Sequence, residues 1–344
     1  MTTFGLTTDT MFQPGAPAVP GLIFRGFQGE SDYPLMAAVI EASKVADQIE
    51  RVTTAEDVAR NYSHMTNSDP YKDMIFAEVH GEVVGYGRCE WHQNTAGERL
   101  YFHLGFVKPA WRRKGIGRGM LGAMQRRLCE IAATQPGDGP RFFEAFAADT
   151  EAATEALLRC AEYSPVRHFY QMVRPLSEAV SVSPLPPGLE VRPASPEHRR
   201  AIWEADQEAF RDHWGYVPGT EVDYQRWLDD PIQDPALWQI AWDAQADQVA
   251  GMVLNFLNRA ENIEYKRERG WTEGLSVRRP WRKRGVARAL LTRSLQMFKD
   301  MGMTEAALGV DTENVTGALR LYESVGFRVV KRSSAYRRPL VADR

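Results

Sequence analysis

One stretch of this sequence occurs twice, and it decides how the chain is organised. Residues 107–117 read VKPAWRRKGIG and residues 277–287 read VRRPWRKRGVA, so the two segments align without a gap, 170 residues apart. Both contain the pattern Arg-x-x-Gly-x-Gly/Ala, with the arginine at Arg112 and Arg282. Similarity at a long fixed offset predicts that a whole structural unit is repeated.

Three further pairs of similar segments occur in the same order. They are GLIFR and GLEVR at 21–25 and 188–192, EVVG and QVAG at 82–85 and 248–251, and VRPL and RRPL at 173–176 and 337–340. Residues 177–187 lie between the halves, are rich in Ser and Pro, and have the composition of an extended linker. We therefore expect one domain at 21–176 and a second at 188–341.

The composition is that of a soluble globular protein. The 344 residues are too many for one ordinary core and suit two domains. Lys and Arg (42) nearly balance Asp and Glu (45), so the net charge of -3 gives no general attraction to nucleic acid or to anionic membrane. No apolar run approaches the ~20 residues that span a bilayer. We expect a cytoplasmic monomer or homodimer.

Neither disulfides nor metals are expected. The three cysteines, Cys89, Cys129 and Cys160, are far apart and odd in number, which favours a reducing compartment. No Cys-x-x-Cys or His-x-x-x-His pair suggests a metal site. Residues 1–20 do not have the pattern of a signal peptide, and we expect them to form a flexible lead-in.

Hydrophobic periodicity predicts the same order of elements in each half, β-α-α-β-β-β-α-β-α-β-β. The clearest element is a long amphipathic helix that begins directly after the glycine turn and ends at Gly302. In the second half we expect helices at 196–211, 223–228, 287–298 and 314–325, and strands at 189–192, 238–242, 248–257, 271–277, 307–310, 327–330 and 334–338. The expected fold class is α/β (α+β), with a mixed, mostly antiparallel sheet flanked by helices in each half.

The repeated turn has the properties of a pyrophosphate site. The first amides of a helix have no partner within it and carry partial positive charge, so they bind anions. Small residues at Gly285 and Ala287 let a phosphate approach the backbone. A P-loop is absent, and the spacing of Gly115, Gly117 and Gly119 does not fit a Rossmann turn. The alternative is a basic helix start that is simply solvated. The presence of the turn at equivalent places in both halves makes this alternative less favoured.

The second half resembles a known family over its whole length. A strand, the Arg-x-x-Gly-x-Gly/Ala turn, a long helix, a strand and a final helix containing Asn314, Ala318 and Tyr322 before Gly326-Phe327 are together the pattern of GNAT acetyltransferases. The tandem arrangement is similar to that of mycothiol synthase-like enzymes, in architecture only. The resemblance implies two tandem GNAT folds and acetyl-CoA as the acetyl donor, with no metal.

The resemblance also implies which residues bind acetyl-CoA. In this family the strand before the turn parts from the strand after the long helix, and the exposed backbone pairs with the pantetheine arm. In the second half the implied residues are Leu275, Ser276, Val277, Arg282, Lys283, Arg284, Gly285, Val286, Ala287, Arg288, Asn314, Ala318 and Tyr322. A second, weaker site would use Phe106, Val107, Arg112, Arg113, Lys114, Gly115, Ile116, Gly117 and Arg118. Asn314 could equally be a plain helix N-cap.

Two residues are candidates for proton transfer. The resemblance places the Tyr322 hydroxyl near the thioester sulfur, where a phenol can protonate the departing thiolate; the alternative is an ordinary half-buried aromatic. Glu273 is the best candidate base, and by strand alternation it would share a face with Leu275 unless a bulge intervenes. A solvated strand-end glutamate is the competing interpretation.

The acceptor region is expected between the first two helices of the second half. Asp212, His213 and Trp214 lie there, and the first two are also second-line candidates for the base. Neighbouring acidic residues, Glu208, Asp212, Asp223, Asp229 and Asp230, would suit a cationic acceptor, although such residues are often simply solvated.

The two halves differ in the final helix. When their ends are aligned without a gap, Leu158 takes the place of Tyr322 and Thr150 that of Asn314. We therefore expect the first half to bind CoA without contributing catalysis, and an isolated 188–344 fragment to carry the activity.

The leading hypothesis is an acetyl-CoA-dependent N-acetyltransferase that acts on a primary amine of a small molecule by direct attack. The alternatives are acetylation of a protein or peptide amine, and a non-catalytic acyl-CoA sensor.

Overall fold

The structure is a computed structural model that describes residues 18–63, 65–137, 139–314 and 317–340, so most of the expected lead-in lies outside it. The chain divides into two compact units. Unit 1 contains the chain up to Val166 together with the residues from Ser334 onward, and unit 2 contains Arg167–Ser333. Both units are mixed α/β structures with a mostly antiparallel sheet, as the sequence predicts.

From residue 189 to the final helix, unit 2 follows the predicted order of elements with one additional short helix. Its sheet has the strand order β7-β8-β9-β10-β11-β6. The strands are β6 (Ser164–Pro175), β7 (Leu189–Arg192), β8 (Gln239–Asp243), β9 (Gln248–Phe256), β10 (Arg269–Val277) and β11 (Glu305–Asp311). The helices are α6 (Arg199–Phe210), α7 (Glu221–Asp229), α8 (Arg259–Glu264), α9 (Val286–Asp300) and α10 (Ala318–Ser324).

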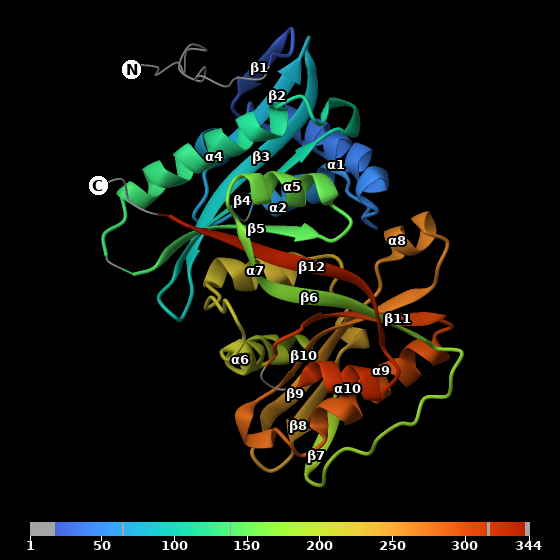
Figure 1. Cartoon of the computed structure of the whole chain (residues 1–344). Coiled ribbons are helices and arrows are strands. Elements are labelled where there is room, and N and C mark those ends of the chain that lie inside the picture. Colours follow the sequence, from blue (N-terminus) through green and yellow to red (C-terminus); the bar gives the residue numbers. More distant parts are fainter. Residues whose placement is uncertain (1–17, 64, 138, 315–316, 341–344) are drawn as a thin grey trace. The chain divides into compact units, whose positions relative to one another are not determined.

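Unit 1 repeats this architecture, with the strand order β1-β2-β3-β4-β5-β12. The strands are β1 (Leu22–Arg25), β2 (Met74–Val79), β3 (Glu82–Gln93), β4 (Arg99–Val107), β5 (Arg141–Ala148) and β12 (Arg328–Pro339), of which the part from Ser334 belongs to this unit. The helices are α1 (Tyr33–Asp47), α2 (Ala55–Ser63), α3 (Pro70–Asp73), α4 (Ile116–Ala133) and α5 (Ala152–Cys160). Figure 1 shows the long α4 lying across the strands.

Each unit is completed by a strand from the other half of the sequence. β6 follows the N-terminal half in sequence but pairs antiparallel with β11 from Glu305↔Pro175 to Asp311↔Phe169. β12 ends the chain and lies beside β5 in the sheet order (Figure 1). The sequence repeat placed the boundary at 177–187, whereas the compact units divide at Val166 and again at Ser333. The difference arises because strand pairing, not chain order, decides which unit a strand joins.

The exchanged strands make equivalent contacts in the two units. Arg174 of β6 donates to the carbonyl of Val325 at the end of α10, at 2.6 Å. Arg338 of β12 donates to the carbonyl of Ala161 at the end of α5, at 3.1 Å. A guanidinium at the C-terminal end of a helix satisfies a carbonyl that has no partner within the helix and complements the helix dipole. The repeated Val/Arg-Arg-Pro-Leu segments therefore serve the same purpose in each unit.

Two core layers flank the sheet of unit 2. Ile202 and Ala205 of α6 pack with Met252 and Leu254 of β9 on one face. On the other face α9 packs on β8, β9, β10 and β11, and its apolar side chains form the second layer together with α10 and with β6. The helix pair α6–α7 and the helix pair α9–α10 are thus on opposite faces of the same strands.

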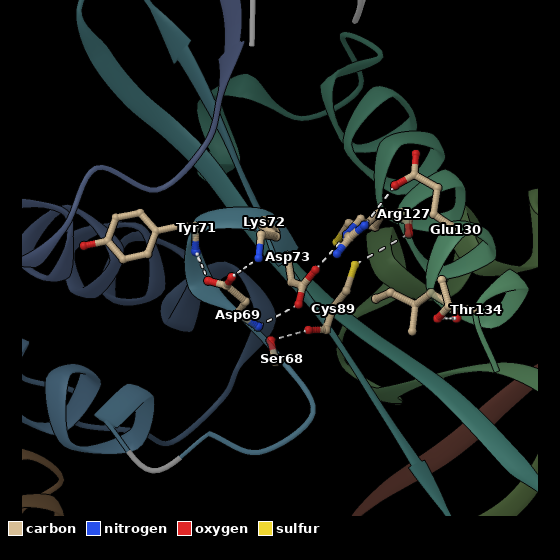
Figure 2. A network of polar contacts seen from close by, with 11 residues as sticks. Ser68, Asp69, Tyr71, Lys72, Asp73, Cys89, Arg127, Glu130 and Thr134 are labelled. Atoms are coloured by element: carbon tan, nitrogen blue, oxygen red, sulfur yellow. Dashed lines mark hydrogen bonds and ion pairs between the residues drawn. The ribbon is translucent and has the colours of Figure 1, made fainter. Parts of the chain in front are cut away.

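A polar network in unit 1 holds α3 against α4 (Figure 2). The buried Asp73 carboxylate accepts from the amide of Asp69 at 2.6 Å and from Arg127 Nε at 2.8 Å. Arg127 also pairs with Glu130 at 3.0 Å. Because both oxygens of Asp73 have partners, the network anchors the start of β2 to the long helix.

Some predicted elements differ from the structure. The expected strands at 327–330 and 334–338 are one continuous strand, β12, and α8 was not anticipated. The final helix was expected from 314, but α10 begins at Ala318, with Gly317 as its N-cap at φ 76°. The plain N-cap interpretation of Asn314 is therefore wrong for this helix. In the described residues no helix has the length and apolar character needed to cross a membrane.

Candidate active site

The glycine turn has the same backbone geometry in both units. In unit 2, Lys283 and Gly285 have φ of 60° and 90°, and in unit 1, Arg113 and Gly115 have φ of 63° and 86°. Left-handed backbone favours glycine, which explains Gly115 and Gly285 at the position directly before each long helix. The repeated sequence therefore folds into a repeated structure at this position.

The turn presents unpaired amides beside positive charge. The first bond within α9 runs from the amide of Ala289 to the carbonyl of Gly285 at 3.0 Å, so the amides before Ala289 have no acceptor in the helix. Within the described part of the chain, no carboxylate forms an ion pair with Lys283 or Arg284. Amides and cations that converge without a protein partner suit an anionic group such as a pyrophosphate.

Arg282 has a different position from the one expected of a phosphate ligand. Its guanidinium donates to the carbonyls of Val277 at 2.9 Å and Ala209 at 3.0 Å, and to Asp212 at 2.7 Å. These bonds use all three nitrogens and join the end of α6 to the end of β10. Arg282 therefore braces the turn through contacts within unit 2.

The same brace exists in unit 1. Arg112 donates to the carbonyl of Val107 at 2.9 Å and to both oxygens of Asp47 at 2.6 Å. A bidentate arginine–carboxylate pair fixes geometry as well as charge. The two arginines of the repeated motif therefore make equivalent contacts within their units.

β10 and β11 separate after a short parallel pairing. Their register runs only from Arg269↔Glu305 to Trp271↔Ala307, although β10 continues to Val277. β4 and β5 of unit 1 also part after Phe102↔Glu144, while β4 continues to Val107. The expected splayed strands are therefore present in both units. The separation exposes backbone groups that an extended chain could pair with.

A β-bulge distinguishes β10 from β4. Glu273 pairs with Leu254 and Ser276 with Met252, so three steps along β10 match two along β9. Gly274 at the bulge has φ 58°. β4 pairs with β3 without any register shift along its length. Of the two equivalent strands, β10 therefore has a bulge close to the point where the strands part, and β4 does not.

The bulge changes the face on which Glu273 lies. Leu254, which is opposite Glu273, belongs to the layer under α6, whereas Leu275 packs with the layers under α9. The expectation that Glu273 and Leu275 share a face was wrong, because the extra residue breaks the two-residue alternation. Glu273 is directed to the α6 side, where the acceptor is expected.

The carboxylate of Glu273 reaches from β10 to β11 across the gap where these two strands part. Its Oε1 accepts from the amide of Gly309 in β11 at 2.9 Å. Burial of this half-buried side chain raises the pKa of Glu273 to about 7, and the hydrogen bond from Gly309 opposes the rise. A carboxylate that titrates near neutral pH is suited to general-base work.

Tyr322 lies in the core beside the same gap. Its side chain is buried, and its ring meets Phe327 edge-on at 6.0 Å between centroids. Burial raises the pKa of the Tyr322 phenol, and the negative charge of Glu273 raises it further. The phenol therefore stays protonated, which is the form that a general acid needs.

The other expected acetyl-CoA residues of unit 2 lie on β10, on α9 and around the start of α10. Ser276 is buried on β10, and its hydroxyl bonds to Asp206 at 3.2 Å. Arg288 of α9 donates to Ser324 Oγ at 2.6 Å. Asn314 lies in the turn after β11, where its amide donates to the carbonyl of Asp311 at 3.2 Å, and Ala318 begins α10.

The three expected acceptor residues have unequal surroundings. Asp212 is paired with Arg279 and Arg282, whose hydrogen bonds lower its pKa. An ion-paired carboxylate with a low pKa is a poor base, so the structure argues against that role. Burial lowers the pKa of His213. Trp214 contacts Phe169 of β6 at 6.2 Å between ring centroids.

In unit 1 aromatic side chains pack together between α1 and the strands β2, β3 and β4. Phe76 stacks with Tyr86 at 5.9 Å, and Tyr86 contacts Phe106 at 5.5 Å. Phe27 packs on Phe76 at 6.3 Å. Leu158, aligned with Tyr322, is buried in the core. Unit 1 thus has the turn and the splay, but neither the bulge nor the phenol.

Comparison with known families matches each half of the chain. A model described as "Acetyltransferase (GNAT) family" matches residues 199–327, and one described as "Acetyltransferase (GNAT) domain" matches residues 70–171. The chain belongs to the GNAT acetyltransferases. Its two GNAT domains are arranged in tandem, in agreement with the repeat and with the two similar units.

Several relatives of this GNAT protein are named mycothiol acetyltransferase. That of Salinispora tropica is 29% identical over 261 residues, covering 75% of this chain and 78% of the relative. That of Thermobispora bispora is 26% identical over 298 residues, covering 86% of this chain and 92% of the relative. The similarity thus extends over both GNAT domains.

Solved structures share the tandem fold. A GCN5-related N-acetyltransferase from Sphaerobacter thermophilus matches with a TM-score of 0.68 at 26% identity, covering 92% of this chain and 95% of that one. A tandem GNAT protein from the clavulanic acid biosynthesis pathway matches with a TM-score of 0.63 at 14% identity, covering 94% and 100%. The second likeness concerns the fold alone.

Sequence reasoning missed one polar residue of this site, Asp206. It lies on α6, and the carboxylate is half-buried beside Ser276. The sequence feature that could have indicated Asp206 is its position in α6, directly after the buried Ala205. A single aspartate in a helix is too common for this position to single it out. In the described residues, no group of three or more His, Cys, Asp or Glu side chains could hold a metal ion.

Proposed function

We propose that unit 2 transfers an acetyl group from acetyl-CoA to a primary amine of a small molecule. The observation that carries the proposal is the bulge of β10, which brings Glu273 to the acceptor face beside a protonated Tyr322. Acetyl-CoA supplies a thioester whose carbonyl carbon is attacked by the amine. The C–N bond forms as the C–S bond breaks.

Each protein group has a defined part in this reaction. Glu273 accepts the proton that the attacking ammonium must lose, and Tyr322 donates a proton to the departing thiolate. The amides after Arg282 hold the pyrophosphate, and the free edge of β10 holds the pantetheine chain. Positioning of the two reactants and polarisation of the carbonyl by a backbone amide supply the remaining rate gain.

Unit 1 is proposed to bind CoA without transferring the acetyl group. It has the same turn geometry, with Gly115 at φ 86°, and the same parting of strands. It has Leu158 in place of the phenol, and Phe76, Tyr86 and Phe106 pack against one another on its strands. Equilibrium titration with CoA is expected to give two sites per chain, and exchange of Arg113 and Lys114 for alanine should remove the weaker one.

Thiol release from acetyl-CoA across a panel of amines tests the proposal. The panel starts with acceptors related to mycothiol, because relatives at 26–29% identity carry that name, and continues with amino sugars, polyamines and short peptides. Release that depends on a small amine supports the proposal. Release only with peptides would favour acetylation of proteins, and no release with any amine would favour an acyl-CoA sensor.

A further inference from the structure

The carboxylates around the C-terminal end of α6 are nearly all neutralised by arginine. Glu208 pairs with Arg278 at 2.7 Å, and Asp212 pairs with Arg282 at 2.7 Å and also with Arg279. The acidity that the sequence suggests for this region is therefore not available to a cationic acceptor at these two positions.

Asp206 is the exception on this helix face. Among the described residues its one hydrogen-bond partner is the hydroxyl of Ser276 at 3.2 Å, and no Lys, Arg or His there forms an ion pair with it. Burial raises the pKa of Asp206 to about 7, and only the Ser276 hydroxyl opposes the rise. A half-buried carboxylate without a cation is costly for the fold, so such a residue calls for a ligand that supplies the charge.

The register of β10 places Asp206 near the proposed reaction centre. Glu273 and Ser276 are opposite Leu254 and Met252, and both of these belong to the layer under α6. The bulge thus puts two residues that are three apart on the same face. Two steps along β9 separate their partners, which corresponds to about 7 Å along the strand.

We infer that Asp206 binds a second cationic group of the acceptor, held about 7 Å or slightly more from the amine that is acetylated. The inference rests on the proposed function and adds a substrate class to it. The acceptor carries the reactive primary amine at one end, beside Glu273, and a protonated amine or guanidinium at the other. Ser276 orients the Asp206 carboxylate through its hydroxyl.

Alkyl amines of matched length test directly whether a second cationic group improves the acceptor. The probes are α,ω-diamines of three to eight carbons, the n-alkylamines of the same lengths, and the corresponding ω-amino alcohols, each assayed for kcat/KM with acetyl-CoA. We expect diamines of one intermediate length to exceed the monoamines at least tenfold. Asp206→Asn, which is isosteric and can still accept from Ser276, should reduce that preference at least tenfold, mainly through KM.

Two variants control the interpretation. Glu208→Gln makes the same chemical change on the same helix at a carboxylate that is already paired with Arg278, and should retain the diamine preference. Asp206→Glu keeps the charge but advances it by one methylene, so the best diamine should become shorter.

Binding without turnover separates this inference from the proposed function. The same amines are titrated calorimetrically into the full-length protein saturated with CoA. Tighter binding of diamines that is lost in Asp206→Asn, together with no thiol release, would refute the proposed function and leave this inference standing. The inference is overturned if diamines have no advantage at any length, if Asp206→Asn retains the advantage, or if amino alcohols share it.

Discussion

The carboxylate of Glu273 accepts a hydrogen bond from the amide of Gly309 at 2.9 Å, across the gap where β10 and β11 part. The bond joins two strands that no longer pair with each other there. It fixes one oxygen of the carboxylate. This contact links the fold of unit 2 to its proposed chemistry, because the proposed base is held at the point where the two strands part.

Exchange of Glu273 for glutamine should abolish most of the activity. A general base contributes ~10²–10⁴-fold, and the amide cannot accept the proton. We expect kcat to fall within that range while the KM for acetyl-CoA changes little. Steady-state kinetics measures both, and a kcat within a few fold of the wild-type value would exclude Glu273 as the base.

The raised pKa of Glu273 predicts two pH effects. The base is active when ionised, so kcat/KM of the wild type should rise as pH increases through about 7. The folded pKa lies above the unfolded value of about 4.3, so the folded state loses stability as pH rises from about 4 to 7. The glutamine variant lacks this loss, and its Tm relative to wild type should therefore be higher at pH 8 than at pH 4.

Exchange of Tyr322 for phenylalanine tests the proposed acid. The ring keeps its contact with Phe327, so folding should be retained, while the proton donor is lost. We expect kcat to fall by ~10²-fold or more, with the largest effect for acyl donors whose thiolate is the poorest leaving group. Unchanged turnover in a variant with a wild-type thermal transition would show that the phenol is structural.

Alanine at Gly274 should disturb the bulge. Gly274 has φ 58°, and an added Cβ would lie 3.1 Å from Leu254 Cγ. Left-handed backbone costs a non-glycine residue roughly 1–2 kcal/mol, so we expect a lower Tm and a lower kcat. Gly105 of unit 1 is the matched control, because it lies on the unbulged β4 and an added Cβ would have ordinary contacts there, the nearest at 3.5 Å. Equal effects of the two substitutions would argue against a role for the bulge.

The exchanged strand changes what a fragment can do. From the sequence alone, residues 188–344 were expected to be an independent catalytic domain. In the structure β6 precedes that fragment, and Met172 of β6 and Leu176 directly after it are buried in the core of unit 2. We now expect 188–344 to lack a cooperative thermal transition, and a fragment that begins at 164 to recover more structure. A cooperatively folded and active 188–344 fragment would contradict this.

Much of the fold could be predicted from the sequence, because it depends on local patterns. The long helix α9 follows from the i, i+3, i+4 spacing of its apolar residues, and its start follows from Gly285. The repeat at 107–117 and 277–287 indicates the tandem arrangement and the two turns, whose backbone geometry proved to be the same. Tyr322 and Glu273 were also named from the sequence, through the positions that the resemblance to GNAT acetyltransferases gives them in the final helix and in the strand before the turn.

Other features depend on partners that are distant in the sequence. Arg282 looks like a phosphate ligand in its motif, but Asp212 and Ala209, some 70 residues earlier, engage it as a brace. No local pattern predicts the exchange of β6 and β12, because an edge strand joins whichever sheet offers matching hydrogen bonds and apolar contacts. Asp206 could not be singled out from the sequence for a similar reason. Its importance depends on which of the nearby carboxylates have arginine partners, and those partners are distant in the sequence.

The sequence by itself determined the repeat, the family, the glycine turns and the difference between Tyr322 and Leu158, since these depend on residue type and spacing along the chain. Only the tertiary structure decided where Glu273 is directed, which carboxylates are paired and which half of the chain completes each sheet. The physical reason is that a single extra residue in β10 reverses side-chain direction from that point on, and that burial and pairing of charges are set by strands and helices that meet only after folding.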